Sequence, residues 1–119
     1  MVTFEDHRRY TDPPRANVLD ELRRLVLALD GRGRSVERCT PAQRIVYEIC
    51  GYQSFIEVKV ARSSITVRLL DGRRPDPAGI TTPIPSTNNW SYKRNIKIST
   101  LAQLEAAMPF ITASYHRSN

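Results

Sequence analysis

The chain has 119 residues, a length that suits a single domain, and its 40% hydrophobic and 25% charged residues exclude a wholly disordered protein. Two cysteines and the lack of a long apolar run exclude a disulfide scaffold and a membrane span. The 18 basic and 12 acidic residues give a net charge of +6, and arginine supplies most of the basic side chains. This charge favours an anionic partner such as nucleic acid, although a coding bias toward arginine would produce the same composition.

The N-terminal half begins with a polar stretch and then becomes helical. Residues 1–16 predict a polar arm that leads into a helix, because Pro13 and Pro14 suit the first turn of one. Apolar side chains recur at steps of three and four from residue 17 to residue 30, which is typical of an amphipathic helix. Residues 32–43 are basic and turn-like, and Val36 is the candidate start of a short irregular strand.

The pattern then changes to the alternation of β-strands. Residues 44–49, 55–60 and 65–69 alternate apolar and polar side chains across short turns, which predicts an antiparallel meander. A long loop at 71–89 follows, and then a short strand at 95–98. Apolar steps from 101 to 115 predict a second helix, with a kink or break near 106–109 because Pro109 cannot donate a backbone hydrogen bond.

This order of elements predicts a two-layer α+β fold. A four-stranded, mainly antiparallel sheet carries an N-terminal and a C-terminal helix on one face. Residues 17–117 form this single domain, and residues 1–16 precede it. The residues expected in the core are Leu22, Leu25, Ile56, Val58, Val67, Leu104 and Ile111.

Several segments resemble a small prokaryotic domain of unknown function, family 5655. The resemblance rests on residues 55–60 and 65–69, on Trp90, on residues 94–98, and on the helix that closes with Ser114 and Tyr115; it extends over residues 17–117. Domains of that family often lie at the C-terminus of predicted restriction-type nucleases and predicted transport proteins. The resemblance therefore implies an accessory module without established catalytic residues. The order of elements and the Ser-Tyr ending are also loosely similar to the MmcQ/YjbR double-wing family, for which DNA binding is proposed.

The sheet face turned away from the helices is the first candidate binding surface. Strand alternation places Lys59, Arg68 and Lys97 on that face, next to Glu57. These cations are suited to phosphate groups or to an acidic partner. The alternative is a solvated face with cross-strand ion pairs, such as Glu57 with Arg68 or Lys97.

A second candidate lies just before the last strand, where Tyr92, Lys93 and Arg94 follow Trp90. Aromatic rings interleaved with cations stack on bases while the charges hold the backbone. The alternative is that Trp90 packs under the long loop, which leaves Tyr92, Lys93 and Arg94 to contact a ligand.

Catalytic and metal-binding patterns are weak. The sequence Glu57-Val58-Lys59 fits a strand motif of some nucleases, but no upstream Asp stands out as its partner. Cys39 and Cys50 have no metal-site spacing and no identifiable base, and the two histidines are far apart in sequence. We therefore predict a protein that is not an enzyme and needs neither metal nor cofactor.

The sequence thus predicts a cytoplasmic, non-catalytic accessory module that binds DNA or RNA through Lys59, Arg68, Tyr92, Lys93, Arg94 and Lys97. No membrane partner is expected, because no apolar run approaches the length of a membrane span, and the N-terminus shows no secretory signal, which favours the cytoplasm. Two alternatives stay open. One is a protein-interaction subunit that docks onto a nuclease or another enzyme. The other is a small-ligand pocket between the long loop and the C-terminal helix.

Overall fold

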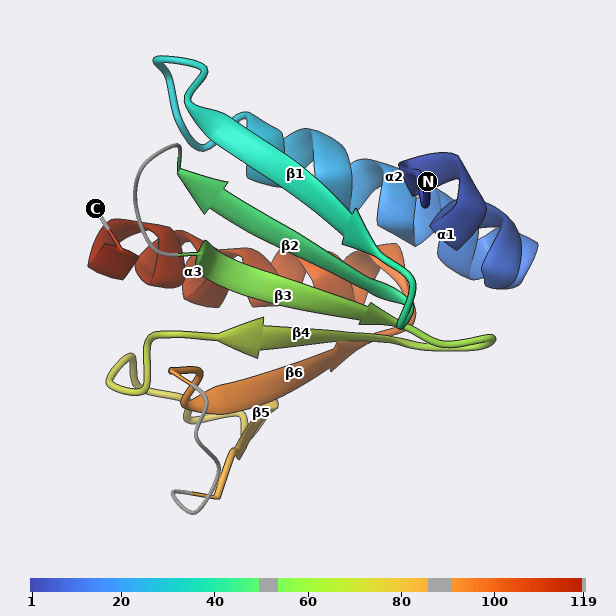
Figure 1. The fold of residues 1–119 in the computed structure, drawn as a ribbon. Coiled ribbons are helices and arrows are strands. Elements are labelled where there is room, and N and C mark those ends of the chain that lie inside the picture. The colour runs from blue at the N-terminus through green and yellow to red at the C-terminus, as the bar shows by residue number, and fades with distance from the viewer. Residues whose placement is uncertain (50–53, 86–90, 119) are drawn as a thin grey trace.

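The computed structural model describes residues 1–49, 54–85 and 91–118, which form three helices and one six-stranded antiparallel sheet (Figure 1). The elements in chain order are α1 (Phe4–Tyr10), α2 (Pro13–Leu27), β1 (Ser35–Thr40), β2 (Arg44–Ile49), β3 (Ser54–Val60), β4 (Ile65–Leu69), β5 (Thr81–Pro83), β6 (Arg94–Ile98) and α3 (Leu101–Ser118). The strands lie in the order β1-β2-β3-β4-β6-β5. The α+β class is confirmed.

The prediction of four strands is wrong, because the sheet has six. The four predicted strands correspond to β2, β3, β4 and β6, and the two additional strands, β1 and β5, form its edges. β1 contains Val36, the candidate start of an irregular strand, which the predicted four-stranded sheet does not include. An edge strand pairs on one side only and is partly exposed, so its sequence shows little apolar alternation. β1 contains Glu37 and Arg38 at its centre, and β5 is only three residues long and ends at Pro83.

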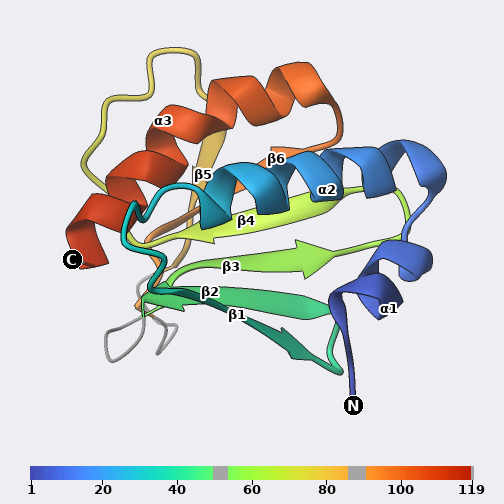
Figure 2. The same ribbon diagram turned by 90° about the horizontal axis from the view of Figure 1, so that it is seen from above.

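Helices α2 and α3 lie on the same face of the sheet (Figures 1 and 2), as predicted. The core fills the space between them and the sheet. Six of the seven predicted core residues are buried, and Leu25 is partly buried at the edge of the core. Ser114 on α3 is also completely buried: its hydroxyl donates to the Phe55 carbonyl (2.6 Å) and accepts from the Leu70 N–H (2.7 Å). These two bonds fix the position of α3 against β3 and the end of β4.

The segment 1–16, predicted as a polar arm that leads into a helix, contains α1 and the first turn of α2. Thr3 and Asp6 form a capping box at the start of α1, in which each side chain accepts a hydrogen bond from the other residue's N–H. Asp12 caps α2, with Pro13 in its first turn, as the sequence indicates. Arg8 pairs with Asp20 at 2.9 Å and connects the two helices. Local capping and this packing therefore order a segment whose composition is polar.

Helix α3 continues through Pro109 to Ser118, so the helix does not break near 106–109, and the alternative of a kink there stays a prediction. Proline removes one intrahelical hydrogen bond, to the carbonyl of Glu105. Glu105 is exposed, where its carbonyl is accessible to water. Phe110 and Ile111, directly after the proline, are buried and hold the second half of the helix on the core.

The predicted long loop 71–89 contains β5, which pairs with β6. Its residues 86–89 lie outside the described part of the chain, as do Cys50 and Trp90, so the interpretations attached to those two residues stay predictions. None of the helices in the described ranges has the length and apolarity needed to cross a lipid bilayer.

Candidate functional site

The sheet face opposite α2 and α3 is uncovered by any described helix (Figures 1 and 2). Register and alternation place the predicted residues Lys59, Arg68 and Lys97 on this open face. Lys97 is exposed, whereas Lys59 and Arg68 are half-buried. Lys59 lies over the adjacent turn, and its ammonium donates to the Ala42 carbonyl at 2.7 Å.

Glu57 lies at the centre of the open face and neutralises part of its positive charge. Its side chain is largely buried, and Oε1 lies 2.8 Å from Nη1 of Arg68 and 3.3 Å from Nε of Arg44. This arrangement is the cross-strand ion pair that the sequence offered as the alternative to phosphate binding. Arg68 therefore has a structural role in the sheet, and Lys97 is the more accessible cation.

Tyr92 and Lys93 lie where β6 begins. The Tyr92 hydroxyl is 2.8 Å from the Ser54 hydroxyl, which connects this segment to β3, and burial raises the pKa of Tyr92. The Lys93 backbone bonds to the Leu69 carbonyl at 2.7 Å and to the Ile84 N–H at 2.9 Å. The side chain of Lys93 is exposed. These backbone bonds fix the point from which the lysine extends into solvent.

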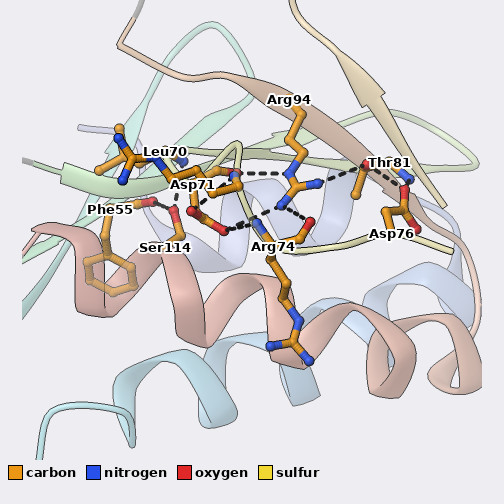
Figure 3. A network of polar contacts seen from close by, with 9 residues as sticks. Phe55, Leu70, Asp71, Arg74, Asp76, Thr81, Arg94 and Ser114 are labelled. Atoms are coloured by element: carbon orange, nitrogen blue, oxygen red, sulfur yellow. Dashed lines mark hydrogen bonds and ion pairs between the residues drawn. The ribbon is translucent and has the colours of Figure 1, made fainter. Parts of the chain in front are cut away.

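Arg94 does not belong to the exposed surface predicted for it. It is 8% exposed and faces the helix side of the sheet, with its guanidinium 5.0 Å from the centre of the Phe110 ring. Nε donates to the Asp71 carbonyl at 2.8 Å and Nη2 to the Arg74 carbonyl at 2.9 Å (Figure 3). Nη2 also lies 3.4 Å from the Asp71 carboxylate. Arg94 is thus an internal clamp on the segment that follows β4.

Two aspartates complete the ordering of this segment. Asp71 accepts hydrogen bonds from the N–H groups of Arg73 and Arg74, at 3.2 and 3.1 Å. Asp76 accepts from the Thr81 hydroxyl (2.6 Å) and from the N–H of Thr81 (2.8 Å), and these bonds lower the pKa of Asp76 (Figure 3). Both carboxylates are therefore occupied in shaping the backbone.

The ordered segment forms one wall of a hollow with a volume of about 470 Å³, which we call the basic hollow. Its lining residues are Gly72, Arg73, Thr81, Pro83, Lys93, Arg94 and Arg117. An adjacent hollow of about 490 Å³ shares Lys93 and Arg117 and adds Leu70 and Ser91. Among the described residues, no carboxylate lines either hollow. The local potential is therefore positive and suited to an anion.

The structure brings together cations that sequence reasoning left apart. Of the predicted binding residues, Lys93 lines the basic hollow with an exposed side chain, whereas Arg73 and Arg117 are not among the predicted residues. Arg73 belongs to a dipeptide that resembles an ordinary solvated loop, and Arg117 is in the last turn of α3, distant in sequence. Only the packing of α3 against the sheet places Arg117 beside Arg73 and Lys93.

A third hollow has the opposite character. It lies between α2 and α3, has a volume of about 390 Å³ and is mainly apolar. Leu25, Leu101 and Met108 contribute to its lining, and Glu21 and Glu105 flank it. We call it the apolar groove. Leu101 is 55% exposed there, which is high for a leucine side chain.

Acidic, histidine and cysteine side chains that could serve in catalysis occupy structural positions or the surface. Asp71 and Asp76 shape the segment around Arg94, and Glu57 pairs with two arginines. His116 is exposed, and burial raises the pKa of the Cys39 thiol, which reduces its reactivity. Within the described ranges, no three His, Cys, Asp or Glu side chains are grouped closely enough to hold a metal ion.

Comparisons with known proteins add no relative: no family model, no curated protein and no solved structure matches the chain. Membership of the family that the sequence resembles therefore stays a prediction, and the geometry of the hollows and of the open face is the basis for the functional argument.

Proposed function

We propose that the chain is a non-catalytic accessory module of the cytoplasm that binds the phosphate groups of an anionic partner, with nucleic acid as that partner. The observation that carries the proposal is the grouping of Arg73, Lys93 and Arg117 around the basic hollow, without a lining carboxylate among the described residues. Lysine and arginine bind phosphate through charge-assisted hydrogen bonds and release counterions from the nucleic acid.

The open face gives a nucleic acid strand a path beyond the hollow. Lys93 lines both hollows, and Tyr92, the preceding residue, bonds to Ser54 on β3. Lys97 and Lys59 lie farther along the open face. A strand anchored at the basic hollow can thus cross the sheet with cations beneath it. Contacts of this kind recognise the backbone rather than the base sequence.

The proposal is tested by fluorescence anisotropy with a labelled single-stranded oligonucleotide at low and moderate salt. We expect dissociation constants on the order of 10⁻⁴–10⁻⁶ M, as for non-specific contacts, with a steep dependence on salt. Lys93→Glu should weaken binding at least about tenfold, because one attraction becomes a repulsion. Arg9→Glu is the matched control: it makes the same type of charge reversal in α1, at the opposite end of the molecule from the C-terminus of α3 (Figure 1).

Absence of salt-sensitive binding at micromolar protein would contradict the proposal. An equal loss in Lys93→Glu and Arg9→Glu would also contradict it, because the effect would then follow net charge alone and no particular site.

The apolar groove supports the second candidate function, docking onto a nuclease or another protein. An apolar floor with Leu101 exposed and a flanking pair of glutamates suits a protein surface rather than phosphate. Binding of this kind buries apolar area and depends weakly on salt. Co-purification of a stoichiometric protein that is lost in Leu101→Glu, with the nucleic-acid affinity unchanged, would favour this function.

A further inference from the structure

The basic hollow concentrates more positive charge than one phosphodiester requires. Arg94 has the Asp71 carboxylate 3.4 Å from its guanidinium, so its charge is largely balanced inside the protein. Arg73, Lys93 and Arg117 are exposed and line the hollow from three segments of the chain. A phosphodiester carries a single charge, whereas a terminal phosphate carries about −1.5 to −2, and an oligophosphate chain carries more.

The presence of two adjoining hollows further limits the kind of ligand that fits the site. The basic hollow has further cationic lining from Arg73, whereas the described residues that the adjacent hollow adds are Leu70 and Ser91, which carry no charge. Lys93 and Arg117 line both hollows and so lie where the two meet. Each volume, about 470 and 490 Å³, is in the range of small-molecule sites. The pair therefore fits a ligand with one densely anionic end and one less charged portion.

The site is also held in place before any ligand arrives. Asp71 fixes the backbone of Arg73, and Arg94 holds the carbonyls of Asp71 and Arg74. Gly72 lies directly against the stem of Lys93: a Cβ atom at position 72 would be only 3.1 Å from the Lys93 Cβ. Glycine at this position thus allows the lysine to pass close to the backbone. Such preorganisation lowers the entropic cost of binding.

From this geometry we propose that the two hollows bind a nucleoside 5′-oligophosphate. The phosphate chain occupies the basic hollow, between Arg73, Lys93 and Arg117, and the nucleoside lies in the adjacent hollow, beside Leu70 and Ser91. This inference rests on the proposed function, because it names the part of the anionic partner that the site recognises. The same chemistry occurs in a free nucleoside triphosphate and at the 5′ end of an RNA strand.

The test compares three RNA oligonucleotides of one sequence that carry a 5′-hydroxyl, a 5′-monophosphate or a 5′-triphosphate. Anisotropy titrations at about 150 mM salt weaken the backbone contacts without abolishing them, so the contribution of the 5′ end is easier to detect. We expect the triphosphate RNA to bind at least about tenfold more tightly than the hydroxyl RNA, since it adds several charge-assisted hydrogen bonds. ATP and inorganic tripolyphosphate serve as free competitors.

Two sets of variants locate the effect. Lys93→Gln with Arg117→Gln should remove the preference for the triphosphate end. Lys59→Gln with Lys97→Gln, a matched pair on the open face, should weaken all three RNAs alike and keep their ratio. Gly72→Val keeps the net charge and pushes on the Lys93 stem, so the preference should fall although no cation is lost. Thermal unfolding of each variant verifies that it is folded.

The outcomes separate this inference from the proposed function. Salt-sensitive binding with equal affinity for the three 5′ ends overturns the inference and leaves the proposed function standing. Calorimetry could instead show that the native protein binds ATP, that the Lys93→Gln and Arg117→Gln variant does not, and that no RNA binds. This result overturns the proposed function and supports a free nucleotide as ligand. Competition by ATP against triphosphate RNA supports one shared site. If ATP does not compete, the assignment of the RNA 5′ end to these hollows is overturned.

Discussion

Ser114 shows how one small polar side chain connects three elements. Its hydroxyl is completely buried and bonds to the Phe55 carbonyl and to the Leu70 N–H, so α3, β3 and the end of β4 meet at a single oxygen. The next residue, Tyr115, donates to Asp30 at 3.1 Å and packs edge-on against the Phe55 ring. Arg117 follows two residues later, so these anchors also position one wall of the basic hollow.

Ser114→Ala should therefore destabilise the fold by about 1–3 kcal/mol, because it leaves a buried N–H and a buried carbonyl without their partner. The measurement is urea unfolding followed by circular dichroism. Thr112→Ala, on the same helix but less buried, should change the free energy of unfolding by about 0.5 kcal/mol or less. Equal effects at the two positions would mean that the serine hydroxyl has no special role.

Asp30 makes stability depend on acid pH. Arg34 and the Tyr115 hydroxyl lower the pKa of Asp30 from 3.8 to about 2. A carboxylate with a lowered pKa in the folded state stabilises fully above pH 4 and loses this contribution as the pH falls toward 2. We expect the melting temperatures of the native protein and of Asp30→Asn to differ at pH 6 and to converge near pH 2. A constant difference across that range would contradict the assignment.

At the scale of elements, α3 has two different faces. Leu104 is 1% exposed and packs in the core, whereas Leu101 is 55% exposed and borders the apolar groove. The two leucines are three residues apart in the first turns of one helix, so their helix propensities are matched. Replacing each of them by alanine therefore compares the stability contribution of a buried leucine with that of an exposed leucine in the same helix.

Leu104→Ala should destabilise by about 2–4 kcal/mol, because it removes buried methyl groups and leaves a cavity. Leu101→Ala should cost about 1 kcal/mol or less, because the site is mostly solvated. Guanidinium unfolding of both variants gives the comparison. A small effect at Leu104 would mean that the buried face of α3 is assigned incorrectly.

Elements with clear periodicity were predictable from the sequence, and those governed by local capping or by an edge position were not. β4 and β6 alternate between buried and more exposed residues, and β2 and β3 are mostly buried, so all four strands contain many apolar residues. β1, β5 and α1 are short and largely polar, so their order comes from pairing and caps. Arg94 could have been placed correctly, since it shares strand parity with Ile96 and Ile98 and so faces the helices.

The candidate site was predictable in part, because its residues converge only in the folded chain. Lys93 lies at the site, and its local sequence context predicts a binding role. Arg73 and Arg117 are 44 positions apart, and nothing in the sequence pattern joins them. Lys59 and Lys97 lie on the open face as alternation predicts, whereas the pairing of Arg68 with Glu57 is set by cross-strand register.

At the scale of the whole molecule, the cations on the open face predict how the affinity for nucleic acid depends on salt. Each phosphate contact that is lost should lower the slope of log affinity against log salt by about one unit. Lys59→Gln with Lys97→Gln should therefore lower the slope for a single-stranded oligonucleotide by about two units, without unfolding the protein. Anisotropy at four salt concentrations measures the slope. An unchanged slope would mean that the strand does not cross the open face.

The strand order also determines when the two hollows come into existence during folding. β1 to β4 pair with sequence neighbours through short connections, whereas β6 reaches β4 only after the chain has closed the long segment between them, and α3 comes last. Contacts between distant segments form late because they cost more chain entropy. The basic hollow is lined by the segment after β4, by β5, by the start of β6 and by the end of α3, and we therefore expect it to be complete only after the transition state. An anion bound there should slow unfolding and leave the folding rate nearly unchanged.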